Sequence, residues 1–285
     1  MYEDLGDPES FLAGLEAGSR LIEAPMPHGG YMRFREWGHG RPVIVMHGSF
    51  GAWTHWTKNI QALVAAGYRV LGADTPGLGD SDVPPDDWDV FGIGGLVAGA
   101  IDYALAPGER FHLAGFSFGG IVGGQAVRIL EDRCDGFIVV GSNALGVRLD
   151  ESRPDLHKMR STMSPAEMQA VHKHNLGVIM FGDHSRIDDL ALHIQQRNTR
   201  KARIRSGIIP RGDSLSNVLT GLHIPVTGIF GEKDATAGKF MFEREALFAS
   251  LPHCRSFDMV DGAGHWAQYE RPDLVNPLLL EALAA

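Results

Sequence analysis

The stretch that decides the fold is residues 111–120, which read FHLAGFSFGG. A short, mostly apolar run of this kind forms a buried strand, and the small residues after Ser117 are typical of a helix that starts close to that strand. A serine on such a tight turn adopts strained backbone angles, which only small flanking residues allow without a clash. Taken alone, the pentapeptide G-x-S-x-G also fits an ordinary glycine-serine turn. Its context predicts that the Ser117 hydroxyl projects from the end of the strand as a nucleophile.

Two segments near the C-terminus supply an acid and a base. Residues 224–234, IPVTGIFGEKD, are an apolar run followed by a turn and a carboxylate at Asp234. Residues 259–266, MVDGAGHW, are a second strand end, a loop of small residues and His265. A serine hydroxyl needs a base to take its proton, and the imidazole needs a carboxylate to fix its tautomer and stabilise the imidazolium. The order Ser117, Asp234, His265 therefore predicts a catalytic triad.

Each downstream member also has a purely structural interpretation. Asp234 fits a turn or helix-capping residue, and Glu232 or Asp261 could replace it as the acid. His265 is one of 13 histidines, and a histidine in a loop is more often solvated than catalytic. The joint occurrence of strand end, chain order and spacing favours the triad.

The oxyanion hole is expected in a loop upstream. A buried-type strand runs into the pattern H-G-x-x-G within residues 43–51, VIVMHGSFG. The helix that follows the nucleophile offers unpaired N–H groups and the positive end of a dipole, which suit a developing oxyanion. We therefore expect the N–H of Phe118 to act with a second N–H from this loop, that of Ser49 first and Phe50 second. His47 is expected to hydrogen-bond the loop and not to act as a base.

Short runs rich in Val, Ile and Phe alternate with longer stretches of helical spacing, which indicates β-α units and a mostly parallel sheet. The predicted strands are residues 31–37, 42–46, 69–73, 111–114, 136–140, 225–230 and 255–260. The first of them is expected to pair antiparallel at an edge. The predicted helices are residues 53–66, 91–105, 118–130, 239–251 and 272–284.

The alternation breaks down in the middle of the chain, and this divides the sequence into regions. Residues 145–222 are polar and helical in pattern without a convincing strand, so we interpret them as an inserted helical cap. Because parallel sheets hold ligands outside the carboxyl ends of their strands, this insertion is expected to lie over that edge. The core then comprises residues 25–144 and 223–285, and residues 1–24 are a loosely attached N-terminal extension.

The composition fits one compact domain. Of the 285 residues, 44% are hydrophobic and 21% are charged, which allows a large buried core. The net charge is −9 and the basic residues are spread along the chain, apart from a short cluster at 197–205, so no nucleic-acid-binding face is expected. No apolar run approaches the ~18 residues that cross a bilayer, and the acidic start MYEDLGDPES is unlike a signal peptide. We expect a soluble cytoplasmic protein that acts on a small molecule without a membrane partner. Whether it forms a homo-oligomer stays open.

Several blocks in register make the chain resemble the α/β-hydrolase superfamily from about residue 25 to the C-terminus. They are HGSFG (47–51), DTPGLGDS (74–81), GFSFGG (115–120), GEKD (231–234) and GAGHW (262–266). The resemblance implies an α/β-hydrolase fold, with a mostly parallel, doubly wound sheet flanked by helices and a helical cap inserted after the sixth strand. It implies no metal and no organic cofactor.

One branch of this superfamily is similar in two further places. The segment GAGHWAQYERPDLVN, residues 262–276, resembles hydrolases that cut carbon–carbon bonds in ring-cleavage products of aromatic catabolism. Those enzymes carry a lid arginine that grips a substrate carboxylate, and Arg197 in the segment QRNTR, residues 196–200, falls at a matching distance after the nucleophile. The alternative for Arg197 is an exposed, solvated side chain.

The chain also departs from that branch. The branch usually has asparagine before the nucleophile and a Gly-Pro pair in the oxyanion loop, where this chain has Phe116 and Phe50-Gly51. These aromatics, with Trp53 and Trp266, would give the substrate apolar walls, although each also fits an ordinary core position. We therefore expect a serine hydrolase that forms an acyl-enzyme with an ester, or a related acyl compound, of a small apolar molecule. Carbon–carbon bond hydrolysis, a cofactor-free haloperoxidase activity and a catalytically silent ligand-binding protein are the alternatives.

Overall fold

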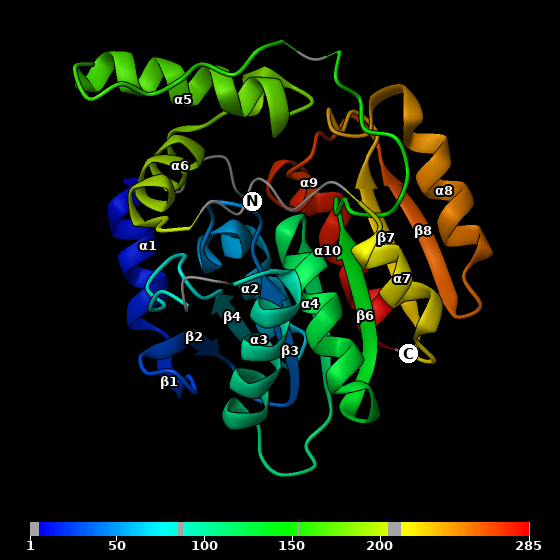
Figure 1. Ribbon diagram of the computed structural model, residues 1–285. Coiled ribbons are helices and arrows are strands. Elements are labelled where there is room, and N and C mark those ends of the chain that lie inside the picture. The colour runs from blue at the N-terminus through cyan, green and yellow to red at the C-terminus, as the bar shows by residue number, and fades with distance from the viewer. Residues whose placement is uncertain (1–5, 85–87, 153, 205–211, 285) are drawn as a thin grey trace.

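An eight-stranded sheet forms the centre of the molecule (Figure 1). The computed structural model describes residues 6–84, 88–152, 154–204 and 212–284. The strands are β1 (Arg20–Pro25), β2 (Tyr31–Trp37), β3 (Arg41–Met46), β4 (Tyr68–Asp74), β5 (Phe111–Phe116), β6 (Cys134–Val140), β7 (Val226–Gly231) and β8 (Cys254–Val260). They lie in the order β1-β2-β4-β3-β5-β6-β7-β8, and only the pairings of β2, with β1 and with β4, are antiparallel. The predicted fold class is confirmed.

The N-terminal segment adds a strand that was not expected. α1 (Pro8–Ala17) buries two leucines, and β1 then pairs with β2. The strand expected at an edge, residues 31–37, therefore has a neighbour on each side. The expected antiparallel pairing is confirmed, and the expected edge position was wrong because residues 20–25 supply the edge strand instead. Residues 1–5 of the predicted extension, 1–24, lie outside the described residues.

Helices cover both faces of the sheet. They are α2 (Thr57–Ala65), α3 (Val90–Ala104), α4 (Phe118–Ile129), α7 (Ser214–Gly221), α8 (Met241–Ser250), α9 (Ala267–Glu270) and α10 (Pro272–Leu283). One cluster of buried side chains joins the sheet to α3, α4, α7 and α8, and a second joins it to α2 and α10. The predicted helix at residues 53–66 consists of two elements, the 3-10 helix η1 (Trp53–Trp56) and α2. Among the described helices, none combines the length and the apolar character needed to cross a membrane.

The inserted region follows β6 and lies over the loops that carry the predicted site. It contains α5 (Pro165–Ile179), the 3-10 helix η3 (His184–Arg186) and α6 (Asp189–Lys201), which form the top of the molecule in Figure 1. The backbone N–H of Trp266 donates to the carbonyl of Met180 at 2.8 Å, and the Thr54 hydroxyl donates to Asn198 at 3.0 Å.

The last helix of the predicted cap range, 145–222, does not lie with α5 and α6. α7 packs against α4, where a Cβ placed on Gly124 would lie 2.8 Å from a Leu215 methyl carbon. The structure thus places α7 in a helical layer of the core. Two parts of the predicted range, residue 153 and residues 205–211, lie outside the described residues.

Candidate active site

The turn between β5 and α4 holds Ser117 in a strained conformation. Its φ is 51° and its ψ is −115°, values that residues other than glycine rarely adopt. A Cβ on Gly115 would lie 2.5 Å from Gly120 Cα, and a Cβ on Gly119 would lie 2.6 Å from the carbonyl oxygen of His47. Glycine is therefore required for the close approach of strand, helix and the neighbouring loop. The turn places the Ser117 side chain at the carboxyl end of the sheet.

Ser117, His265 and Asp234 form one hydrogen-bonded chain. His265 Nε2 lies 3.0 Å from Ser117 Oγ, and His265 Nδ1 lies 2.8 Å from Asp234 Oδ2. The residues come from three different loops at the ends of β5, β7 and β8, and all three are buried. This is the arrangement in which a histidine can take a proton from the serine while the carboxylate holds its tautomer.

The other two candidate acids lie elsewhere. Glu232 accepts the backbone N–H of Gly262 at 3.0 Å, and its side chain is exposed. Asp261 is exposed as well, and its carbonyl oxygen accepts a hydrogen bond from Arg271. Of the three carboxylates, Asp234 is the one that the structure brings to His265.

Asp234 is buried yet held in its ionised form. Burial alone would raise the pKa of this carboxyl group, but the charge and hydrogen bond of His265, together with hydrogen bonds from Thr236, lower the pKa below its usual value. Thr236 donates both its backbone N–H and its hydroxyl to Asp234 Oδ1, each at 2.8 Å. Oδ1 of the carboxylate thus accepts hydrogen bonds from Thr236, and Oδ2 is hydrogen-bonded to His265.

The predicted oxyanion loop lies directly against the nucleophile. A Cβ on Gly48 would be 3.2 Å from Ser117 Cβ. His47 Nε2 accepts the backbone N–H of Thr75 at 3.0 Å, so its proton is on Nδ1 and is donated to the Gly48 carbonyl at 2.8 Å. Because a trans peptide directs its C=O and N–H to opposite sides, the N–H of Ser49 points away from His47.

The remaining predicted oxyanion residues flank this peptide. Phe118 is the first residue of α4, and the first N–H groups of a helix have no partner within it. Phe50 has a φ of 55° and a side chain that is 40% exposed. The structure therefore brings the loop and the helix start together, while their role in binding an oxyanion stays a prediction.

A second histidine, which carries no motif in the sequence, holds the preceding peptide, that between His47 and Gly48. The N–H of Gly48 donates to His55 Nδ1 at 3.2 Å. Burial lowers the pKa of His47 to about 4 and that of His55 well below its ordinary value, so both imidazoles are neutral at pH 7. His55 lies in a helical stretch without a motif, so no local signal could have revealed its contact with Gly48.

The predicted apolar walls separate into two groups. Phe116 is fully buried, and its ring centroid lies 5.1 Å from that of His265 and 5.6 Å from that of His55. Trp266 is fully buried too and donates its indole N–H to the carbonyl of His55. Trp53 packs instead against Trp37, with ring centroids 5.2 Å apart. Phe116 and Trp266 therefore pack around the two histidines, and Trp53 belongs to the core.

Arg197 forms an ion pair with a carboxylate of the N-terminal helix. Its guanidinium donates to Glu16 of α1, and Arg35 lies on the same carboxylate at 3.7 Å. This partner was not expected, because α1 brings a carboxylate to α6 in a long-range contact that no spacing in the sequence reveals. The role of Arg197 as a clamp for a substrate carboxylate stays a prediction.

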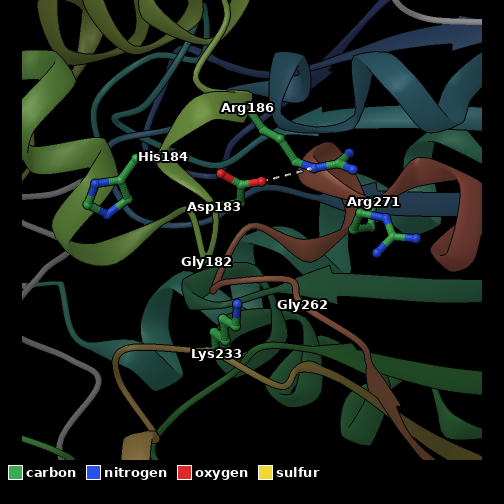
Figure 2. Close-up of a pocket in the computed structure, with 7 residues that line it drawn as sticks. All are labelled: Gly182, Asp183, His184, Arg186, Lys233, Gly262 and Arg271. Atoms are coloured by element: carbon green, nitrogen blue, oxygen red, sulfur yellow. Dashed lines mark ion pairs between the residues drawn. The ribbon is translucent and has the colours of Figure 1, made fainter.

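A pocket of about 470 Å³ lies beside the loops of the acid and the base (Figure 2). Its lining contains no triad member, although Lys233 directly precedes Asp234; the lining residues are Gly182, Asp183, His184, Arg186, Lys233, Gly262 and Arg271. Figure 2 shows the ion pair between Asp183 and Arg186 on the side of the inserted region. The pocket therefore marks where that region meets the loops of Asp234 and His265.

A buried glutamate joins the same parts. Glu270 Oε2 accepts the N–H of Gly182 at 3.0 Å and that of Gly264 at 2.7 Å, and Oε1 accepts the N–H of Asp183 at 2.7 Å. One carboxylate thus fixes the residues next to His265 to the segment between α5 and η3.

Comparisons with known proteins agree with this architecture. The sequence profile described as "Alpha/beta hydrolase family" matches residues 43–278. The chain is 30% identical over 267 residues to a 2-hydroxy-6-oxo-6-phenylhexa-2,4-dienoate hydrolase of Burkholderia cepacia, covering 87% of this chain and 89% of that protein. It is 28% identical to a 2-hydroxy-6-oxononadienedioate/2-hydroxy-6-oxononatrienedioate hydrolase of Comamonas testosteroni, with the same two coverages.

Solved structures share the fold. A variant of a meta-cleavage product hydrolase from Pseudomonas fluorescens IP01 superposes with a TM-score of 0.72 at 21% identity, covering 93% of this chain and 97% of that chain. An esterase from Exiguobacterium antarcticum gives a TM-score of 0.74 at 18% identity, covering 93% and 99%. At these identities the likeness extends to the fold alone.

Proposed function

The chain belongs to the alpha/beta hydrolase family, and on that basis we propose that it is a serine hydrolase with Ser117 as nucleophile, His265 as base and Asp234 as acid. The observation that carries this proposal is the position of His265, which lies 3.0 Å from Ser117 Oγ and 2.8 Å from the buried carboxylate of Asp234. A serine hydroxyl gains nucleophilicity from a base that is itself oriented by a third group.

The proposed mechanism has two steps. Ser117 Oγ attacks the substrate carbonyl while His265 takes the hydroxyl proton, and the N–H groups of Phe118 and Ser49 hold the oxyanion. His265 then gives the proton to the leaving group as the bond breaks, which leaves an acyl-enzyme. A water molecule, deprotonated by His265, attacks this ester and releases the acid and the free serine.

We propose an ester, or a related acyl compound, of a small and largely apolar molecule as the substrate. Two observations support this choice. Phe116 puts an aromatic ring beside His265 where the carbon–carbon bond hydrolases usually have an asparagine. Arg197, the residue that resembled their carboxylate clamp, is paired with Glu16.

Hydrolysis of a carbon–carbon bond is the second candidate. It is favoured by the relatives from Burkholderia cepacia and Comamonas testosteroni, whose names describe hydrolases of 2-hydroxy-6-oxo dienoates and which the chain matches over most of its length. Such a reaction would use the same triad, so the substrate and not the machinery distinguishes the two candidates.

The test combines labelling with a substrate panel. We expect a fluorophosphonate probe to label the protein on Ser117, because a silent ligand-binding protein does not acylate. Short-chain and aryl esters are then compared with a vinylogous diketo acid by their kcat/KM values. Higher values for the esters support the first candidate, and a higher value for the diketo acid supports the second. Absence of labelling and of turnover on every substrate would refute the proposed serine hydrolase.

A further inference from the structure

A fully buried guanidinium lies behind the proposed catalytic acid. Arg244 of α8 is 0% exposed, and its Nη2 donates to Asn143 Oδ1 at 2.8 Å while its Nη1 donates to the carbonyl of Arg148 at 3.2 Å. None of the ion pairs among the described residues includes Arg244. A buried cation without a bound carboxylate is costly unless a negative charge lies close by. Burial lowers the pKa of the Arg244 guanidinium, and the negative charges of Asp234 and Glu243 oppose this effect by favouring its ionised form.

Hydrogen bonds connect the two charges through neutral side chains. Asn143 Nδ2 lies 3.2 Å from Thr236 Oγ1, and Thr236 Oγ1 lies 2.8 Å from Asp234 Oδ1. Arg244 can only donate hydrogen bonds, so the atom of Asn143 that faces it must be the amide oxygen. The amide nitrogen then faces Thr236 and donates to it. The single hydroxyl proton of Thr236 is therefore left for Asp234.

The chain thus has one direction, from the guanidinium to the carboxylate. Each of the three links joins one donor to one acceptor, and reversing the link between Arg244 and Asn143 would place two donors face to face. A threonine hydroxyl that must donate holds Asp234 Oδ1 in place, which leaves Oδ2 for His265 Nδ1. The positive charge at the far end favours an ionised Asp234.

We propose that Arg244, Asn143 and Thr236 form a positioning relay that keeps Asp234 ionised and oriented toward His265. The proposal rests on the proposed function, since it assigns the relay to the acid of that triad. These residues act through Asp234 and do not touch the substrate. Sequence reasoning did not identify them, because Asn143 follows β6, far before Asp234 along the chain, and neither Thr236 nor Arg244 belongs to a motif.

The titration of His265 distinguishes a positioning role from a purely structural one. A purely structural role would leave that titration unchanged when a relay residue is substituted. Removing the Thr236 hydroxyl leaves Asp234 one donor short, so the carboxylate attracts the imidazolium more strongly and His265 keeps its proton to higher pH. Two further charged side chains lie close to the network. Glu243 acts on the charge of Arg244, and Asp150 lies next to Gly238, two residues after Thr236. The neutral His55 is the further imidazole near His265.

The experiment uses Thr236→Val, which preserves shape and removes the hydroxyl. We expect kcat/KM at neutral pH to fall about tenfold, and the acidic limb of its pH profile to move up by about half a unit or more. Thr236→Ser restores the hydroxyl and should recover most of the rate. Thr227→Val, a buried threonine of β7 outside the network, is the matched control and should behave like the wild type. Asn143→Leu, which cuts the chain one link earlier, should shift the profile in the same direction.

A titration of His265 by NMR separates this proposal from the proposed function. The titration measures the effect of the relay on His265 whether or not the protein turns over a substrate. Fluorophosphonate labelling of the wild type tests only whether Ser117 is the nucleophile. The relay is supported when the His265 midpoint rises in Thr236→Val and Asn143→Leu and stays unchanged in Thr227→Val. It is overturned when the midpoint is unchanged in both variants, or when Thr236→Ser shifts it as much as Thr236→Val.

Discussion

Buried polar groups hold the active site on two sides, and the two supports differ in charge. On the acid side, Asp234 connects through Thr236 to a guanidinium. On the oxyanion side, the two peptides on either side of Gly48 are held by imidazoles that burial keeps neutral: His47 donates to the Gly48 carbonyl and His55 accepts the Gly48 N–H.

The difference suits the role of base that we propose for His265. In that role an imidazolium would form next to both supports, so an anion on one side would stabilise it and a cation on the other would repel it. Neutral histidines can hold a backbone peptide by accepting and donating hydrogen bonds without adding that repulsion. A site of this kind therefore needs its charge on the acid side and uncharged donors and acceptors on the other.

Ser117 lies where the two supports meet, and its removal should have the largest effect. We expect Ser117→Ala to lower kcat by ~10⁴-fold or more, because the nucleophile is lost while the rest of the site remains. Circular dichroism and the unfolding temperature should match the wild type. A variant that retained a tenth of the wild-type rate on the best substrate would show that Ser117 is not the nucleophile.

The acid side is tested by substituting its carboxylate. Asp234→Asn should reduce kcat near neutral pH by ~10⁴-fold, because an amide can leave His265 in the wrong tautomer. Glu232→Gln and Asp261→Asn are the matched controls, since both side chains are exposed and away from His265. Greater damage from Asp261→Asn than from Asp234→Asn would mean that the acid has been assigned to the wrong residue.

The comparison of the two supports also separates what sequence can predict from what it cannot. Ser117, Asp234 and His265 lie in the turns or loops that follow strands β5, β7 and β8, and the end of a strand is a position that hydrophobic patterning and glycines mark locally. The supports also depend on contacts between residues far apart in the chain, such as Arg244 with Asn143. No periodicity encodes such contacts.

Long-range contacts also explain the unexpected edge strand and the unexpected partner of Arg197. Residues 20–25, RLIEAP, bury only two side chains, and pairing with β2 makes them a strand. Arg197 was placed in the site by its spacing from the nucleophile alone, and α1 then proved to hold its partner, Glu16. Local patterns located the β-α units, whereas the edge strand and the ion pair depended on tertiary contacts.

The oxyanion side is tested by His47→Leu. The substitution removes the donor to the Gly48 carbonyl and the acceptor for Thr75, so the Ser49 N–H loses its fixed direction. Loss of one oxyanion donor costs ~10²–10³-fold in kcat, and a misdirected one should cost about tenfold to a hundredfold. His112→Leu is the matched control, because that imidazole is equally buried and neither ring nitrogen has a hydrogen-bond partner among the described residues. Equal losses in both variants would contradict a positioning role for His47.

The neutrality of the buried imidazoles predicts how stability depends on pH. Burial lowers the pKa of His47 and of His112 to about 4 in the folded state, against an ordinary value of 6.5. Between these values the unfolded chain binds protons that the folded protein does not, so the free energy of unfolding should rise with pH from about 4 to 6.5. Each histidine contributes at most about 1.4 kcal/mol per pH unit.

Asp74 acts in the opposite direction over part of this range. Burial raises its pKa to about 6, so the folded protein keeps a proton that the unfolded chain has released, and stability falls as pH rises. Urea unfolding of the wild type and of His112→Leu at several pH values isolates the histidine. The free energy of unfolding of the variant should rise less steeply with pH, by up to about 1.4 kcal/mol per pH unit. Parallel pH dependences of the two proteins would contradict a lowered pKa at His112.

The smallest expected effect belongs to Arg197, whose partner lies outside the site. Its ion pair with Glu16 is partly exposed, with about a quarter of each side chain accessible, so Arg197→Ala should lower the free energy of unfolding by about 0.2–1 kcal/mol. Glu16→Gln should cost a similar amount, and the double variant should cost less than the sum, because both single changes break the same contact. The kcat/KM values for a neutral ester and for a carboxylate-bearing diketo acid should each change by less than about twofold. The reason is that a guanidinium bound to Glu16 does not contact either substrate. A loss of about thirtyfold confined to the acidic substrate would show instead that Arg197 leaves Glu16 to bind it, because losing a buried charge pair costs ~2–5 kcal/mol. That result would favour the carbon–carbon bond hydrolase over the esterase.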